Sequence, residues 1–247
     1  MLKNMNDSCH VSVCNLSQII NRTCVIVAKE DDIGTGTLIS FKNHVFVLTN
    51  YHLIPSLSHC MIIRFKFFDK IEDTMTAEMN DVHYCDEDLD CAFIGIKNTE
   101  YLKSHNITPL DLDCILNVCV DQDLLCVHHQ NAAQMRVSWG KIIHHNREEH
   151  FVVHSCPTEP GSSGSLLYAS SNNKLYPVAL HHARICNHFN PYKAVGEAIQ
   201  LSSLMRFLDN ILKVKNSDYN PDADDDDHCN DCDCHQPDDD LASFYGL

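Results

Sequence analysis

Residues 159–167 read EPGSSGSLL, a turn of glycine and serine that leads directly into an apolar segment. Serine acts as a nucleophile when a base, an orienting acid and preorganised N–H donors surround its hydroxyl. Gly161 and Gly164 flank Ser163 and allow the tight backbone that would aim the N–H groups of residues 161 and 163 at one point. Alone, this stretch leaves two interpretations open: a nucleophile at Ser163, or an ordinary surface turn.

Most of the chain around this turn consists of short segments rich in Val, Ile, Phe and Thr, at the spacing of a sandwich or barrel. One later segment differs, because the apolar residues of SSLMRFLDNILK (202–213) recur at i, i+3, i+4, i+7 and i+8. That period predicts an amphipathic helix with Ser202 or Ser203 as its N-cap. The expected strands are 23–29, 36–41, 44–50, 59–68, 91–97, 124–129, 135–145, 150–156, 164–170 and 176–184.

A candidate base and a candidate acid precede the turn in the chain. His52 comes just after the apolar segment VFVLTN, and Asp90 stands immediately before the apolar segment CAFIGI. Histidine and a carboxylate that orients it are the residue types that activate a serine hydroxyl. Each candidate has a plainer alternative, because His52 is one of 17 histidines and Asp90 lies in the acidic turn DEDLD.

Together, the three candidates resemble the trypsin- or chymotrypsin-like serine proteases. Their order along the chain, His then Asp then Ser, is the order of this family. The stretch GTGTLIS…VFVLTNYH resembles the family's strand pair with T-x-x-H, and PGSSGSLL resembles its G-x-S-G-[GS]-P turn, with Leu166 in place of the usual proline. DCAFIGI is similar to its D-x-A-x-[IL] strand, which favours Asp90 over Asp88.

The resemblance covers roughly residues 20–213 and implies a chymotrypsin-like, all-β fold. It implies two antiparallel β-barrels packed together, with the three residues in the cleft between them and a C-terminal α-helix. The expected divisions are an N-terminal extension (1–20), a first barrel carrying His52 and Asp90 (21–110), a second barrel carrying Ser163 and the helix (111–215), and a disordered acidic tail (216–247).

The same resemblance implies a serine endopeptidase. His52 would be the general base, Asp90 would orient it, and Ser163 would attack the peptide carbonyl. The N–H groups of Gly161 and Ser163 would form the oxyanion hole. Neither a metal nor an organic cofactor is expected. The alternative is a catalytically inactive trypsin-like fold that only binds peptides or proteins.

Two further residues indicate which bond is cut. In a subset of the family, a Thr five residues before the nucleophile and a His on the next strand recognise Glu or Gln at P1, and Thr158 and His181 match these positions. A hydroxyl and an imidazole can both hydrogen-bond a carboxylate or a carboxamide. His182 remains an alternative to His181, because Arg184 replaces the usual glycine. The resemblance therefore predicts cleavage after Glu or Gln.

One departure from the digestive branch concerns the residue before the nucleophile. That branch has an Asp there, which pairs with a new N-terminus after activation, whereas this chain has Ser162 and no IVGG-like start. The chain is therefore closer to constitutively formed members, such as the bacterial glutamyl endopeptidases and the intracellular trypsin-like domains. We interpret Ser162 and Ser165 as turn residues.

Charge is concentrated at the C-terminus. The eleven Asp of residues 217–247 account for −11 of the formal net charge of −16, which leaves −5 for the rest of the chain. Such a segment predicts disorder, and both parts would be repelled by nucleic acid. Within it, HCNDCDCH (228–235) offers His228, Cys229, Cys232, Cys234 and His235 to a soft metal, but the second ligand pair that a structural zinc site needs is missing.

The expected location is the cytoplasm, and the expected partner is a protein or peptide substrate. The chain has neither an apolar run long enough to span a membrane nor a secretory signal. Its fourteen cysteines include Cys24, Cys91 and Cys126 inside strand-like segments, which predicts reduced, buried thiols.

Overall fold

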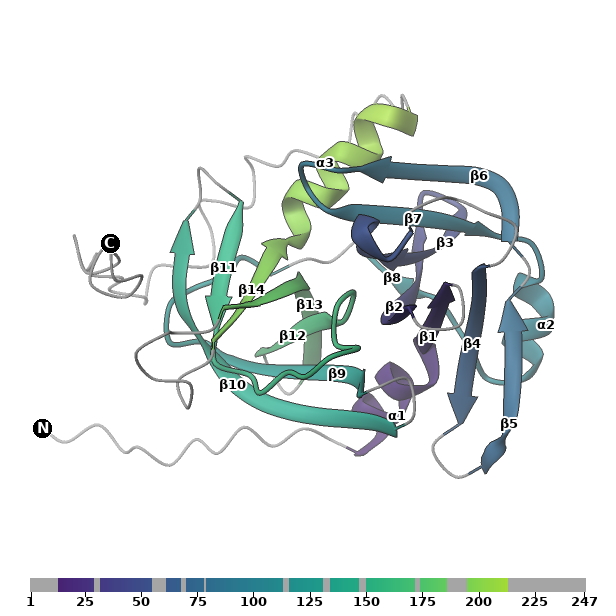
Figure 1. The fold of residues 1–247 in the computed structure, drawn as a ribbon, viewed down its shortest axis with the longest axis horizontal. Helices are drawn as coiled ribbons and strands as arrows, with labels where there is room; N and C mark the ends of the chain where they lie inside the picture. Colours follow the sequence, from purple (N-terminus) through teal and green to yellow (C-terminus); the bar gives the residue numbers. More distant parts are fainter. Residues whose placement is uncertain are drawn as a thin grey trace, which may run out of the picture.

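The computed structural model describes residues 13–28, 32–54, 61–67, 70–77, 79–112, 116–130, 134–146, 150–171, 174–185 and 195–212. Figure 1 shows two β-units beside each other, with helix α1 (Val13–Arg22) and helix α3 (Leu201–Leu212) on opposite sides. The predicted acidic tail (216–247) lies outside the described residues, so its disorder stays a prediction.

The first β-unit is a single sheet of eight strands in the order β5-β4-β1-β2-β3-β7-β6, with β8 paired to β2. Successive side chains of a strand point to opposite faces. In β3, accordingly, Phe46 and Leu48 pack on one side of the sheet and Val47 on the other. The strands are β1 (Thr23–Ala28), β2 (Asp32–Phe41), β3 (His44–Thr49), β4 (Met61–Phe67), β5 (Lys70–Ala77), β6 (Met79–Asp86), β7 (Cys91–Ile96) and β8 (Leu110–Asp111).

The second β-unit is a closed barrel in the order β10-β11-β14-β13-β12-β9. Its antiparallel closure depends on β14, which pairs with β11 on one side and with β13 on the other. The strands are β9 (Asp123–Gln130), β10 (Gln134–Asn146), β11 (Phe151–His154), β12 (Leu166–Ser171), β13 (Lys174–Ile185) and β14 (Val195–Gln200).

A shared apolar cluster joins the two β-units. Phe46 and Phe93 of the first sheet and Leu125 and Tyr168 of the barrel belong to it, and so do residues of both helices. Each unit also has an apolar cluster of its own. Burying this surface from both units favours their packing against each other, which fixes the position of side chains where the units meet.

The predicted all-β, chymotrypsin-like fold class and its C-terminal helix are confirmed. Of the two antiparallel barrels expected, the second is a closed barrel, whereas the first unit is a sheet in which β8 pairs with β2 in parallel. All ten expected strands are present, and the sequence interpretation missed β5, β6, β8, β14, α1, the short helix α2 (Thr99–Ser104) and the 3-10 turn η1 (Tyr51–Leu53). The expected N-cap is wrong, because α3 begins at Leu201 directly after β14 and so contains Ser202 and Ser203. The domain limits stay predictions.

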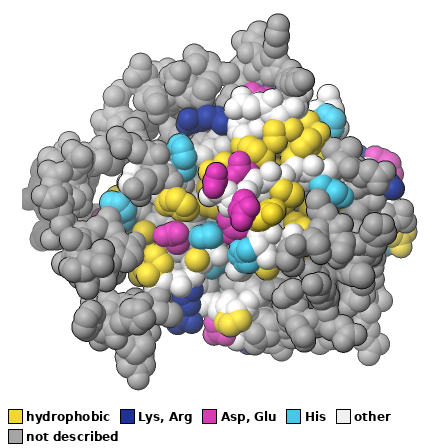
Figure 2. All heavy atoms as spheres, turned by 45° about the horizontal axis from the view of Figure 1, so that its top comes forward, with side chains coloured by type: hydrophobic (Ala, Val, Ile, Leu, Met, Phe, Trp, Pro, Cys, Tyr) yellow, Lys and Arg dark blue, Asp and Glu magenta, His cyan; other side chains and the backbone are white. Residues whose placement is uncertain are grey.

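Side-chain burial agrees with the sequence analysis at three cysteines. Cys24, Cys91 and Cys126 are buried free thiols, as predicted. Figure 2 shows acidic and histidine side chains gathered near the middle of one face, among hydrophobic ones. No helix within the described ranges is long and apolar enough to cross a membrane.

Candidate active site

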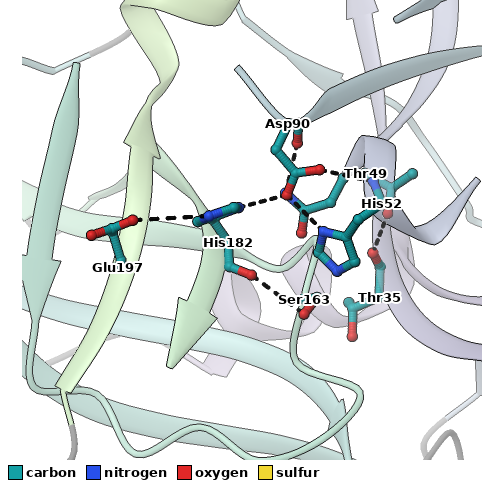
Figure 3. Close-up of polar contacts among 8 residues, drawn as sticks. Thr35, Thr49, His52, Asp90, Ser163, His182 and Glu197 are labelled. Atoms are coloured by element: carbon teal, nitrogen blue, oxygen red, sulfur yellow. Dashed lines mark hydrogen bonds and ion pairs between the residues drawn. The ribbon is translucent and has the colours of Figure 1, made fainter. Parts of the chain in front are cut away.

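His52 and Asp90 form a paired contact through two atoms of each residue. His52 Nδ1 lies 2.7 Å from Asp90 Oδ2, and the backbone N–H of His52 donates to Asp90 Oδ1 at 2.8 Å. His52 lies on η1, directly after β3, and Asp90 directly precedes β7, which pairs with β3. Two adjacent strands therefore bring together side chains that are far apart in the sequence. Figure 3 shows the His52 ring with Asp90 on one side and Ser163 on the other.

Asp90 is held in an unusual backbone conformation. Its φ is +41°, in the left-handed region where few residues other than glycine are found. Its N–H donates to the carbonyl of Glu87 at 3.1 Å, and its carbonyl accepts a hydrogen bond from the buried side chain of Asn50 at 2.9 Å. Such conformations persist where surrounding contacts fix them, and they concentrate at functional sites.

A second histidine contacts the same carboxylate. His182 Nδ1 lies 2.5 Å from Asp90 Oδ2, and His182 Nε2 lies 3.9 Å from Glu197 Oε1 (Figure 3). Burial alone would raise the pKa of Asp90, but the hydrogen bonds from His182 and His52 outweigh it and hold that pKa well below its ordinary value. The same contact with Asp90 raises the pKa of His182.

A β-bulge separates the directions of His181 and His182. The register of β13 against β14 shifts between His181 and Ala183, which leaves His182 as the extra residue. Bulges re-aim side chains and often lie beside active sites. His181 is therefore buried, whereas His182 faces Asp90.

In the turn that carries Ser163, some backbone N–H groups have a hydrogen-bond acceptor and others do not. Gly161 and Gly164 have φ values of +92° and +84°, as expected of a tight glycine turn. Among the hydrogen bonds of the described residues, the N–H groups of Gly161 and Ser163 have no acceptor. Three neighbouring N–H groups do donate to carbonyls: Ser162 to Glu159 (2.9 Å), Gly164 to His181 (3.0 Å) and Ser165 to Ser162 (3.1 Å).

Thr35 of β2 attaches this turn to the first β-unit. Its N–H donates to the carbonyl of Ser163 and its hydroxyl to the carbonyl of Gly161, both at 2.8 Å. The same hydroxyl accepts the N–H of His129 at 2.9 Å, and the carbonyl of Thr35 accepts the hydroxyl of Thr49 at 2.8 Å. The turn is therefore positioned by β2 and not only by its own barrel.

Ser162 is more than a turn residue, which corrects our interpretation of it. It is buried, its hydroxyl lies 2.8 Å from Nδ1 of the buried His128, and the N–H of Glu159 donates to it at 3.0 Å. Ser165 is a turn residue as predicted, because its hydroxyl donates to the carbonyl of Ser162 at 2.6 Å. An internal histidine thus contacts the residue before Ser163.

The two predicted P1 residues lie in different surroundings. Thr158 is buried and lines a groove of about 760 Å³, together with His128, Ser138, Trp139 and Arg184. His181 is also buried, but it does not line that groove, and its Nδ1 lies 3.1 Å from Nε2 of His154. Burial lowers the pKa of His181 well below its ordinary value, and the neighbouring histidines lower it further.

The hydroxyl of Ser163 has a hydrogen-bond partner other than the candidate base. That hydroxyl lies 3.5 Å from the carbonyl oxygen of His182. Among the described residues, it forms no hydrogen bond with His52. Catalytic hydrogen bonds are often long before substrate binds.

One ligand atom from each of His52, Asp90 and His182 lies within 4.8 Å of the other two, and such a group could hold a metal ion.

Comparison with known proteins shows the family to which the chain belongs. A sequence profile of the trypsin-like peptidase domain matches residues 34–176, which include His52, Asp90 and Ser163. The chain belongs to the trypsin-like peptidase family. Curated protein sequences gave no significant match.

Several solved structures share the fold of this trypsin-like chain at low sequence identity. An inactive serine-to-alanine mutant of Rv3671c from M. tuberculosis has a TM-score of 0.58 and 13% identity, covering 81% of this chain and 91% of that one. The serine endoprotease from Yersinia pestis has a TM-score of 0.60 and 14% identity, covering 81% and 66%. The HtrA-type protease AlgW with a tripeptide has a TM-score of 0.60 and 16% identity, covering 82% and 64%.

Several residues of this trypsin-like site were not predicted from the sequence. Thr35 lies in GTGT and Asn50 directly precedes η1, and neither position carries a pattern that names its partner. His182 was considered only as an alternative P1 residue, and its contact with Asp90 depends on the bulge in β13. The contact of His128 with Ser162 is likewise visible only in the fold.

Proposed function

We propose that this trypsin-like chain is a serine endopeptidase in which Ser163 is the nucleophile, His52 the base and Asp90 the residue that orients it. The observation that carries the proposal is the double contact between His52 and Asp90. With Nδ1–H donating to Asp90, the Nε2 of His52 keeps the lone pair that must accept the Ser163 proton. The position of Ser163 on the other side of the ring supports the same assignment.

The turn supports an oxyanion hole at Gly161 and Ser163. Their N–H groups have no acceptor among the described residues, while three neighbouring N–H groups of the turn are used. Donors that are fixed before the reaction stabilise the developing negative charge without reorganising, and one such donor contributes roughly 3–4 kcal/mol.

The reaction then follows from these positions. His52 Nε2 takes the proton of Ser163 as Oγ attacks the scissile carbonyl, and the oxyanion receives the N–H groups of residues 161 and 163. The imidazolium, stabilised by Asp90, donates its proton to the leaving amine, which leaves an acyl-enzyme on Ser163. Water then attacks the acyl group through the same base, and Ser163 regains its proton.

For the cleavage site we propose Glu or Gln at P1, recognised by Thr158 and His181. Thr158 lines the groove, and His181 lies next to His182, whose carbonyl is 3.5 Å from the Ser163 hydroxyl. The lowered pKa of His181 means that its imidazole is neutral at pH 7. A neutral imidazole can hydrogen-bond the P1 side chain but carries no charge to attract a carboxylate. Of Glu and Gln, the uncharged carboxamide of Gln is therefore favoured at P1.

The test is hydrolysis of a fluorogenic peptide library varied at P1, by the wild type and by Ser163→Ala. We expect cleavage after Gln or Glu that disappears in the mutant. Cleavage after other residues would contradict the P1 assignment and keep the peptidase. Equal cleavage by both proteins would reject Ser163 as the nucleophile.

The second candidate function is a trypsin-like fold that binds peptides without cleaving them. It is favoured by one observation, the contact of the Ser163 hydroxyl with the carbonyl of His182. Peptide binding by a folded wild type that hydrolyses no member of the library would support this function. The partners under both proposals are proteins or peptides, and the cytoplasmic location stays a prediction.

A further inference from the structure

Three metal-binding side chains converge beside Ser163 from three separate elements. His52 comes from η1, Asp90 from the turn before β7, and His182 from the bulge in β13. One ligand atom of each lies within 4.8 Å of the other two. We propose that these residues form an inhibitory site for a divalent transition-metal ion of the Zn²⁺ type, which switches the peptidase off.

The donor set fits zinc. Two imidazole nitrogens and one carboxylate oxygen, with a fourth position left for water, are a common open zinc site. Zinc–ligand bonds of ~2.1 Å place tetrahedral donors roughly 3.4 Å apart. Asp90 Oδ2 is 2.7 Å from His52 Nδ1 and 2.5 Å from His182 Nδ1, so small side-chain rotations would open the space.

The surroundings of His182 favour metal binding further. Histidines that bind a metal through one ring nitrogen usually direct the other toward a carboxylate, which orients the ring. Glu197 Oε1 lies 3.9 Å from His182 Nε2 and is placed for this role. The His52 and His182 side chains keep 46% and 29% of their surface exposed, so an ion can reach the site from solvent.

Metal binding at Nδ1 would block the base through its tautomer. The ion uses the Nδ1 lone pair of each neutral imidazole, so the proton of that imidazole must move from Nδ1 to Nε2. His52 Nε2 then bears a hydrogen and has no lone pair for the Ser163 proton. No bond to substrate forms or breaks. The inhibition rests on the proposed roles of His52 and Ser163, whereas the binding does not.

Binding is tested without relying on activity. Zn²⁺ is titrated calorimetrically into full-length Ser163→Ala and into Ser163→Ala with His182→Gln. We expect one site to be lost, or its affinity to fall at least tenfold, in the second protein. Any Zn²⁺ bound by the stretch 228–235 contributes equally in both proteins, so the difference between the two titrations reports the proposed site. Ser163→Ala with His44→Gln, which changes an exposed histidine elsewhere, is expected to retain the site.

Inhibition is tested on the active protein with a P1-matched peptide. Zn²⁺ should inhibit peptide cleavage by the wild type, and adding a chelator should restore the activity. Glu197→Gln should require about tenfold more Zn²⁺, because outer carboxylates contribute 10–100-fold to metal affinity. This variant also replaces His182→Gln if circular dichroism shows that the latter misfolds. If Zn²⁺ binding measured by calorimetry is unchanged in both His182→Gln and Glu197→Gln, the proposed site is overturned. If Zn²⁺ binds to an active wild type without inhibiting it, the inhibitory role is overturned.

Discussion

The backbone N–H of Thr35 donates a 2.8 Å hydrogen bond to the carbonyl of Ser163. Thr35 lies on β2 of the first sheet, and Ser163 lies on the turn before β12 of the barrel. The unit that supplies His52 and Asp90 therefore also holds the backbone of the proposed nucleophile. The site depends on this direct connection as well as on the apolar cluster between the units.

Thr35→Val should reduce both activity and stability. The change removes the hydroxyl that donates to Gly161 and accepts the N–H of His129, with an expected loss of about 1–3 kcal/mol in the free energy of unfolding. Because the Gly161 peptide would lose its anchor, kcat/KM for the best peptide should fall at least about tenfold. The control is Thr23→Val, which removes a buried hydroxyl that donates to the carbonyl of Ile19 at 2.9 Å and has no hydrogen bond to the turn. An equal activity loss in the control would contradict the role of Thr35.

Gly164→Ala should destabilise the protein strongly. Gly164 has φ +84°, and an added Cβ would overlap the carbonyl oxygen of Thr35 and the hydroxyl of Thr49. Strain of this kind combined with a backbone overlap costs on the order of 3 kcal/mol or more. Thermal unfolding should show a Tm lower by roughly 6 °C or more, or no folded protein. A Tm within about 2 °C of the wild type would contradict this geometry.

Asp90→Asn should abolish most of the activity and leave the fold intact. The amide presents a single acceptor oxygen and an NH₂ group where the carboxylate accepts from two imidazoles, so it favours the wrong tautomer of His52. We expect kcat to fall by 10³–10⁴-fold, as an order of magnitude, with KM little changed. The exposed neighbour Asp88→Asn provides the matched control and should retain activity. A loss of less than tenfold at Asp90 would remove it from the mechanism.

Stability should fall as the pH is lowered from about 6.5 to 4, in part because of His154. Burial lowers the pKa of His154 to about 4, from an ordinary value of 6.5. Between these values the unfolded chain binds a proton that the folded protein excludes, so the free energy of unfolding decreases with falling pH. The full effect is about 3 kcal/mol.

Urea unfolding at pH 7 and pH 5 measures this slope. His154→Gln keeps a neutral side chain and should show a smaller pH dependence than the wild type. His44→Gln changes an exposed histidine and should not alter the slope. An identical slope in all three proteins would show that His154 does not contribute.

The sequence predicted those candidate site residues whose signals are local in the chain. Strand periodicity predicted a sandwich or barrel, and the glycines around Ser163 and the order of His52, Asp90 and Ser163 carried the family resemblance that implied the fold class and the candidate residues. The contacts of Thr35, His128 and His182 were not predictable, because they depend on strand register and on a bulge rather than on residues adjacent in the sequence. The helix α1 could have been predicted, since Leu16, Ile19 and Ile20 recur at helical spacing and pack on the shared cluster.

The missed strands have two different explanations. β14 (Val195–Gln200) mixes small and polar residues in VGEAIQ, so its own pattern is weak, and its pairing with β11 and β13 decides its conformation. β5 and β6 are rich in charged and polar residues, KIEDTMTA and MNDVHYCD, which sequence patterns associate with loops. Tertiary pairing overrides local preference in both cases.

The division of the candidate site between two β-units makes its chemistry a reporter of their association. One unit carries His52 and Asp90, the other carries Ser163 and His182, and the chain passes between them from β8 to β9. Two separately expressed halves that reassemble through the shared apolar cluster would restore peptide cleavage only when docked. Under the proposed function, the chain would serve as a scaffold for a split protease, whose peptide cleavage would measure the proximity of any two proteins fused to its halves.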